Sequence, residues 1–138
     1  MLKRIIIIIL ISACSNKHSK SSIIPDVRKE INKKPVASYL ITVGDPRLEQ
    51  KFGVEVYETP YTFKYLLLMQ YQGIEETDTL KIPDFDTWPV VQVKPGSDSL
   101  SCIIGFLNEK KEFMEYKFLS AKNDQLRLTV LRRYAVDR

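Results

Sequence analysis

The sequence predicts an all-β protein, and three observations carry that prediction. Residues 61 to 72, YTFKYLLLMQYQ, alternate apolar and polar side chains with a period of two, as in a strand with one buried face. Residues 99 to 106 and 125 to 134 repeat the alternation. Turn-forming Gly, Pro, Asn and Asp residues separate such runs at regular intervals. Short strands at this spacing are typical of antiparallel sheets.

Taken in order, the segments between turns predict about eight strands. They lie near residues 36–43, 52–58, 61–72, 77–82, 89–94, 99–107, 112–120 and 125–134. The last three are expected to form a meander, joined by the turns NEKK and AKND. The pattern favours an immunoglobulin-like sandwich over a small barrel.

Residues 36–138 are expected to form a single domain. About 103 residues are enough to bury a core without disulfides. No internal repeat and no second domain is visible in this stretch.

The first thirteen residues are read as a signal peptide that is removed. Lys3 and Arg4 give a positive start, Ile5 to Ile11 an apolar centre, and Ser12 and Ala13 a small-residue end. Seven apolar residues in a helix rise only about 10 Å, whereas the hydrocarbon core of a bilayer is about 30 Å thick. The segment is therefore expected to direct export and not to span a membrane.

Ile11-Ser12-Ala13-Cys14 resembles the lipobox of bacterial lipoproteins. That resemblance implies that the thiol of Cys14 carries a diacylglyceryl group and that cleavage occurs before it. Two or three acyl chains anchor a protein stably, whereas one chain binds reversibly. The whole chain is similar in style to small lipoproteins of Bacteroidetes-type bacteria. Since Ser15-Asn16-Lys17 has neither a retention aspartate nor an acidic export cluster, the expected location is the outer membrane, facing the periplasm.

Residues 14–35 are expected to be a basic, flexible tether. Pro25 at its start and Pro35 at its end, with Val27 and Ile31 four residues apart, predict a short helix over 25–34. The lysines of the tether either lie along anionic head groups or only keep the segment soluble.

The net charge of +4 does not indicate a nucleic-acid-binding domain. From Val36 onward there are 13 basic and 15 acidic residues, so the basic excess lies in the leader and the tether. Neither nucleic acid nor a cofactor is expected as a partner.

The domain shows no pattern of catalytic or metal-binding residues. Its one cysteine, Cys102, shares a predicted strand face with Leu100, Ile104 and Phe106 and is expected in the core. The chain's one histidine, His18, lies in the tether. Acidic residues crowd two predicted turns, 75–78 and 84–86, but neither cluster has a known ligand spacing, so no metal site is predicted.

Several residues are candidates for an interaction surface. Trp88 follows a loop and is either a core plug or an exposed anchor. Tyr57, Tyr61, Tyr65 and Tyr71, with Trp88, are candidates for an aromatic platform that binds a glycan or a peptide. The uniformly apolar face of residues 61–71 is expected in the core instead, although Tyr61 and Tyr71 lie near the strand ends, where their hydroxyls can reach the rim. Arg132 interrupts the apolar face of the last strand, which makes Arg132, Arg133 and Tyr134 a candidate docking edge.

Three functions are compatible with these features. The favoured one is a membrane-anchored, non-catalytic adaptor or assembly subunit of an envelope complex for secretion, conjugation or a surface structure. The second is a periplasmic carrier that holds a lipid or a sugar in a cavity. The third is a hydrolase that uses two carboxylates alone.

Overall fold

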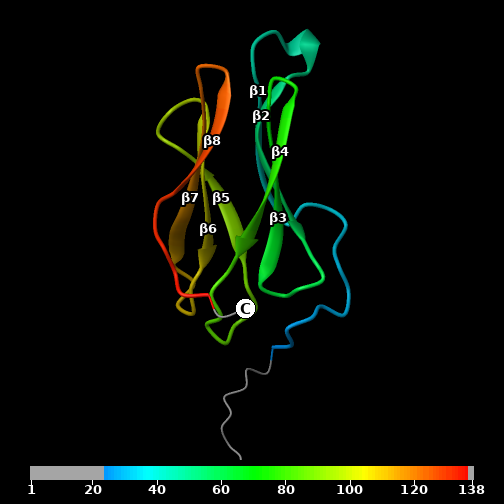
Figure 1. The fold of residues 1–138 in the computed structure, drawn as a ribbon, viewed down its shortest axis with the longest axis vertical. Helices are drawn as coiled ribbons and strands as arrows, with labels where there is room; N and C mark the ends of the chain where they lie inside the picture. The colour runs from blue at the N-terminus through cyan, green and yellow to red at the C-terminus, as the bar shows by residue number, and fades with distance from the viewer. Residues whose placement is uncertain (1–23, 137–138) are drawn as a thin grey trace, which may run out of the picture.

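The computed structural model describes residues 24–136 and confirms the all-β fold class. Eight strands form two antiparallel sheets of four, which face each other as a sandwich (Figure 1). Apart from one turn of 3-10 helix, η1 (Pro46–Leu48), this part of the chain has no helix. The predicted signal peptide and Cys14 lie outside the described residues.

The first sheet is a meander in the order β1-β2-β3-β4. Its strands are β1 (Ala37–Thr42), β2 (Lys51–Glu58), β3 (Lys64–Tyr71) and β4 (Ile74–Lys81). Gln72 and Gly73, both with positive φ, form a two-residue turn between β3 and β4. Such turns match the right-handed twist of paired strands. The predicted strand near 77–82 therefore begins earlier, at Ile74.

The second sheet is also a meander, in the order β5-β6-β7-β8. Its strands are β5 (Val91–Pro95), β6 (Ser101–Leu107), β7 (Phe113–Lys122) and β8 (Gln125–Val130). Asn123 and Asp124 have positive φ and close the last hairpin. The meander predicted for the last three strands is confirmed.

The chain passes from one sheet to the other once, through residues 82–90, which we call the crossover. This order differs from that of immunoglobulin domains, in which strands of the two sheets alternate along the chain. The reason is that each strand pairs with the next strand along the chain, so the first four strands form one sheet and the last four form the other.

The core fills the space between the inner faces of the two sheets. The alternation predicted for residues 61–72 is confirmed over β3, where Tyr65, Leu67, Met69 and Tyr71 are buried. It is wrong at residues 61 and 62, because the strand begins only at Lys64: Tyr61 is 53% exposed and Thr62 is 0% exposed. Fully buried side chains from both sheets meet there: Phe52, Val54, Val56, Leu67, Leu80, Cys102, Ile104, Phe106 and Leu119. Cys102 is 0% exposed, as expected.

An irregular register in the second sheet brings a lysine between the sheets. The pairing of β6 with β7 shifts between Ile104 and Gly105, which leaves Tyr116 as the extra residue of a bulge. Lys117 then lies with its side chain 14% exposed, and its Nζ is 4.0 Å from Oδ2 of Asp78 and 3.5 Å from the carbonyl oxygen of Thr79. Lys117 therefore links the two sheets beside the edge strand β4.

The N-terminal segment differs most from its prediction. No helix forms over residues 25–34, and from Ile24 onward the chain lies against the sandwich. The reason is that backbone groups which a helix would pair internally are bonded elsewhere: Arg28 N donates to Pro60 O at 2.8 Å, and Asp26 O accepts from Thr62 N at 2.9 Å. Residues 24–35 are thus part of the folded unit and not a free tether.

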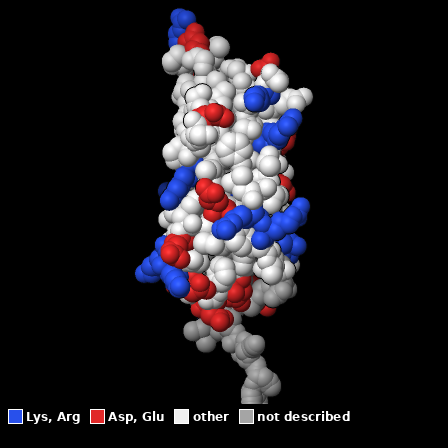
Figure 2. Space-filling model, turned by 90° about the vertical axis from the view of Figure 1, so that its left-hand side faces the viewer, with Lys and Arg blue, Asp and Glu red and all other residues white. Residues whose placement is uncertain are grey.

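Charges on the surface of the domain are mixed. Figure 2 shows acidic and basic side chains interspersed over one side of the molecule, with acidic ones gathered toward the end where the N-terminal segment leaves. This distribution agrees with the near-neutral balance counted from Val36 onward. In residues 24–136 no helix is long and apolar enough to cross a membrane.

Candidate functional site

Trp88 and the contacts that hold the N-terminal segment lie at one end of the sandwich. We call it the crossover pole: it comprises the N-terminal segment from Ile24 to Asn32, the β2–β3 loop, the crossover and the β6–β7 loop (Figure 1). The opposite end, the far pole, carries η1 and the turns after β3 and β7 (Figure 1). Antiparallel pairing places these loops together, because alternate connections of a meander lie at the same end of a sheet.

Arg28 fastens the N-terminal segment to this pole. Its Nε donates to the carbonyl oxygen of Thr59 at 3.0 Å, and its Nη2 donates to that of Thr62 at 2.8 Å. The side chain is only 8% exposed. Carbonyl oxygens of a tight loop point out of the strand ladder, and the planar guanidinium has enough donors to satisfy two of them.

Thr62 makes the reciprocal contacts from the loop. Its hydroxyl donates to the carbonyl oxygen of Pro25 at 2.6 Å, and its backbone N–H donates to that of Asp26 at 2.9 Å. Thr62 is fully buried. Because a buried hydroxyl without a partner is costly, Thr62 needs the N-terminal segment in place.

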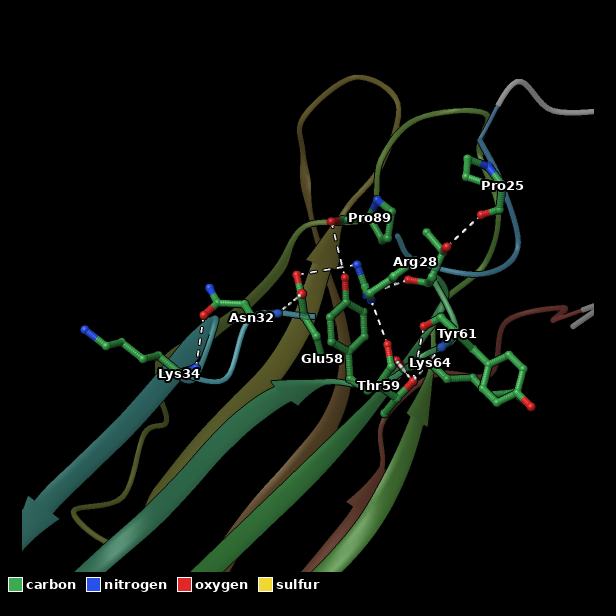
Figure 3. Close-up of polar contacts among 11 residues, drawn as sticks. Pro25, Arg28, Asn32, Lys34, Glu58, Thr59, Tyr61, Lys64 and Pro89 are labelled. Carbon is green, nitrogen blue, oxygen red and sulfur yellow. Dashed lines mark hydrogen bonds and ion pairs between the residues drawn. The ribbon is translucent and has the colours of Figure 1, made fainter. Parts of the chain in front are cut away.

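Two further side chains complete the arrangement that we call the Arg28 clasp, namely Arg28, Glu58, Thr62 and Tyr65 (Figure 3). Arg28 lies 4.9 Å from the ring centroid of Tyr65, and Nη1 of Arg28 is 3.4 Å from Oε2 of Glu58. Burial raises the pKa of Tyr65, and the nearby guanidinium opposes that rise. The Tyr65 hydroxyl donates to the carbonyl oxygen of Pro89 at 3.4 Å, so the clasp also touches the crossover.

Glu58 extends the clasp toward β1. Its Oε1 accepts a hydrogen bond from the backbone N–H of Asn32 at 2.8 Å, and Oδ1 of Asn32 accepts one from Lys34 N at 3.0 Å (Figure 3). Val36 N then donates to Val56 O at 2.8 Å, next to the start of β1. The segment is therefore held at several points between Pro25 and the first strand.

Trp88, one of the exposed candidates, lies beside the clasp. It is 58% exposed, so it is not a core plug, and of its two predicted positions the exposed one is observed. A surface depression of about 770 Å³ lies on one side of it, lined also by Pro25, Arg28, Lys29, Glu30 and Glu58. A second, of about 330 Å³, includes Val90, Leu107 and Lys111 on its lining.

The aromatic platform considered from the sequence does not form. Tyr71 is 6% exposed and packs edge-on against Phe52, with ring centroids 6.3 Å apart. This corrects the expectation that its hydroxyl reaches the rim: Tyr71 ends β3, but it faces inward. Tyr65 is buried in the clasp, whereas Tyr61 is 53% exposed at the crossover pole.

The C-terminal candidates separate into two kinds. The last strand ends at Val130, so Arg132 and Arg133 have left the sheet and are exposed. Tyr134 instead closes one end of the core, with ring centroids 4.9 Å from Phe106 and 5.2 Å from Tyr116. Its hydroxyl donates to Glu115 O at 2.7 Å, which indicates a structural role.

The one cysteine in the part of the chain that the structure describes, Cys102, is not placed as a nucleophile. Burial raises the pKa of the Cys102 thiol to about 12, so it is protonated at neutral pH. Among residues 24–136, no group of three or more His, Cys, Asp or Glu side chains is arranged to hold a metal ion. The acidic residues of β4 and those of the crossover belong to separate segments.

Comparison with known proteins adds no relative: no family model, no curated protein and no solved structure matches this chain.

Sequence reasoning missed the Arg28 clasp. Arg28 was counted as one basic residue of a tether, because its partners are backbone carbonyl oxygens of a loop far along the chain. One signal was available: Ile23 and Ile24 interrupt an otherwise polar stretch. Ile24 is 5% exposed, as expected for a residue that docks.

Proposed function

We propose that this protein is a lipid-anchored, non-catalytic adaptor of the cell envelope, attached through Cys14 and carrying a rigid β-sandwich that binds an envelope protein. The observation that supports this most is the Arg28 clasp. It makes residues 24–36 part of the domain, which leaves only residues 14–23 between the anchor and the folded unit.

A short connection suits an adaptor. Ten residues extend to at most about 34 Å, at roughly 3.4 Å each. A partner must then meet the sandwich close to the membrane, where anchoring both proteins raises their effective concentration. The outer membrane, facing the periplasm, is the location that this proposal assumes.

The interior of the domain favours an adaptor over a carrier that holds its ligand between the sheets. Large side chains that are 0% exposed, such as Phe52, Leu67 and Phe106, occupy that space. Ligand carriers instead keep an open cavity of several hundred Å³. Two depressions lie on the surface beside Trp88, and a third, of about 360 Å³, lies on the surface between Asp98 and Lys122.

Part of the outer face of the first sheet offers apolar surface to a partner. Leu66 of β3 is 39% exposed and pairs in register with Tyr57 of β2 and Thr79 of β4. Leu68, on the same face, is half-buried. Aromatic and aliphatic residues at the centre of a polar face are typical of protein-binding surfaces.

Site-specific photocrosslinking in cells tests the proposal. A photoreactive side chain at Leu66 is expected to form an adduct with one defined envelope protein, whereas the same group at the neighbouring Leu67, which is 0% exposed, forms none. Leu48 and Arg132 sample the far pole and the C-terminal segment. The adduct should disappear with Cys14→Ala, because the domain is then no longer held at the membrane. Absence of any adduct from all three exposed positions contradicts the adaptor function.

A further inference from the structure

We propose that the crossover pole seats against the lipid bilayer, with Trp88 inserted at the interface between head groups and hydrocarbon. This inference rests on the proposed anchor at Cys14 and goes beyond it, because it assigns a second contact to the folded domain. The occupant is a lipid surface, recognised by aromatic and aliphatic side chains.

The position of Ile24 sets which end of the domain meets the membrane. Ile24 is 5% exposed and lies at the crossover pole, where the described chain begins (Figure 1). The clasp holds the segment that follows in place, since Arg28 donates to the carbonyl oxygen of Thr62 and the Thr62 hydroxyl donates to that of Pro25. The path from the anchor therefore arrives at this pole.

The length of the remaining chain brings the pole close. Ten residues extend to at most about 34 Å, at roughly 3.4 Å each. The ten residues of β7 alone span about 33 Å, so the far pole lies roughly one strand length beyond the crossover pole. The far pole can therefore reach the bilayer only near the full extension of these ten residues, whereas the crossover pole can reach it at any shorter one.

The side chains exposed at this pole suit an interface. Trp88 is 58% exposed, Val27 55%, Tyr61 53% and Val90 44%. Val27 and Tyr61 form an isolated β-bridge, which fixes these two residues together, and Trp88 shares a surface depression with Val90. Tryptophan and tyrosine prefer the boundary between water and hydrocarbon, because each ring has an apolar body and a polar group.

The charge balance of this pole argues against attraction to anionic lipid as the main cause. Its segments carry six acidic residues and four basic ones: Asp26, Glu30, Asp84, Asp86, Glu109 and Glu112 against Arg28, Lys29, Lys110 and Lys111. An amphipathic contact that depends on apolar burial does not need anionic lipid. The contact is therefore expected to form on zwitterionic membranes and to change little with salt.

Trp88 reports on its own surroundings, since it is the chain's one tryptophan. The test uses the mature lipidated protein in phosphatidylcholine and phosphatidylethanolamine vesicles, with and without brominated acyl chains. Relative to the detergent-solubilised protein, we expect emission at shorter wavelength, loss of intensity to brominated lipid, and reduced quenching by acrylamide in the water phase.

A matched control moves the fluorophore to the far pole. The double variant Trp88→Phe, Leu48→Trp places it in η1, where Leu48 is 63% exposed. Its emission should stay at long wavelength, with full acrylamide quenching and none by brominated lipid. Equal quenching of both proteins by brominated lipid contradicts a preferred pole.

The outcomes separate this inference from the anchor on which it rests. Protein that does not float with vesicles shows that the anchor is missing, and both proposals fail. Protein that floats while Trp88 remains open to acrylamide and unaffected by brominated lipid overturns the seating alone. A shift seen only in native envelope vesicles, and absent from pure lipid, overturns it too and assigns the pole to a protein.

Discussion

Arg28 and Glu58 form an ion pair, with Nη1 and Oε2 3.4 Å apart, between a segment that precedes the first strand and the end of β2. The pair does not act alone: the same guanidinium donates to two loop carbonyl oxygens, and the same carboxylate accepts from Asn32 N. It is this combined arrangement that makes the N-terminal segment part of the domain.

Removing the guanidinium should release the segment. For Arg28→Ala we expect a loss of about 2 to 4 kcal/mol in the free energy of unfolding, because two carbonyl oxygens and a carboxylate lose their partner in a poorly solvated place. Urea unfolding measures the loss, and hydrogen exchange should show faster exchange over residues 24–36.

Lys29→Ala is the matched control, since it removes a neighbouring positive charge that is exposed. Its stability should change by less than about 0.5 kcal/mol. Arg28→Lys should restore little, because an ammonium group cannot reproduce the planar fork. Equal effects of Arg28→Ala and Lys29→Ala would contradict the clasp.

Gly53 is required for the close approach of β1 to β2. Its φ is 149°, and a Cβ there would overlap the carbonyl group of Tyr39. We expect Gly53→Ala to lower the free energy of unfolding by about 2 to 4 kcal/mol. Gly73→Ala, with φ 83° but open space around it, should cost only about 1 kcal/mol. Chemical denaturation of both variants compares the two; similar losses would show that backbone strain, and not overlap, dominates.

The buried thiol of Cys102 should lower the free energy of unfolding at alkaline pH. Burial raises the pKa of this thiol from 9.0 to about 12, so the folded state holds its proton more tightly than the unfolded state. The free energy of unfolding therefore falls as pH rises from about 9 to 12, because only the unfolded chain releases the proton. Cys102→Ala should be less stable at pH 7 because of the cavity it leaves, but its stability should fall less steeply above pH 9.

Unfolding monitored from pH 7 to 11 tests this slope. The native thiol should also resist iodoacetamide until the domain unfolds, since the reactive thiolate is scarce and the side chain is fully buried. Identical slopes for the two proteins, or fast labelling of the native one, would speak against the buried position.

Tyr134 should matter through its ring more than through its hydroxyl. Tyr134→Phe removes one hydrogen bond, to Glu115 O, and should cost about 1 kcal/mol. Tyr134→Ala also removes the edge-to-face contacts with Phe106 and Tyr116, for a total of about 2 to 3 kcal/mol. Thermal or urea unfolding provides the values. A Tyr134→Ala protein as stable as wild type would contradict this structural role and would favour Tyr134 as part of an exposed docking edge.

The strands were predictable because their signal is local. On β3, alternating apolar and polar side chains indicate which face is buried, and Asn123 and Asp124 mark the end of β7 and the start of β8. The start of β4 was harder, since Glu75, Glu76 and Asp78 look like a loop. They are instead tolerated in an edge strand, where solvent reaches most of the side chains.

The candidate site was only partly predictable because its contacts are long-range. Trp88 was singled out, but its exposure depends on how the crossover passes between the sheets, which no local pattern reports. Arg28 binds backbone carbonyl oxygens. Because every residue has such a group, the sequence does not indicate which residues are the partners of Arg28. Tyr71 and Tyr134 were both candidates for an interaction surface, but packing holds both in place; for Tyr71 this agrees with the core position expected for its strand face.

The most direct test of the central claim is the mass of the mature N-terminus, determined on protein extracted from its native membrane. The account predicts a chain that begins at Cys14, heavier than the unmodified peptide by a diacylglyceryl group on the thiol, with or without a further acyl chain. A chain that still begins at Met1, or one with an unmodified Cys14, would contradict the anchored adaptor.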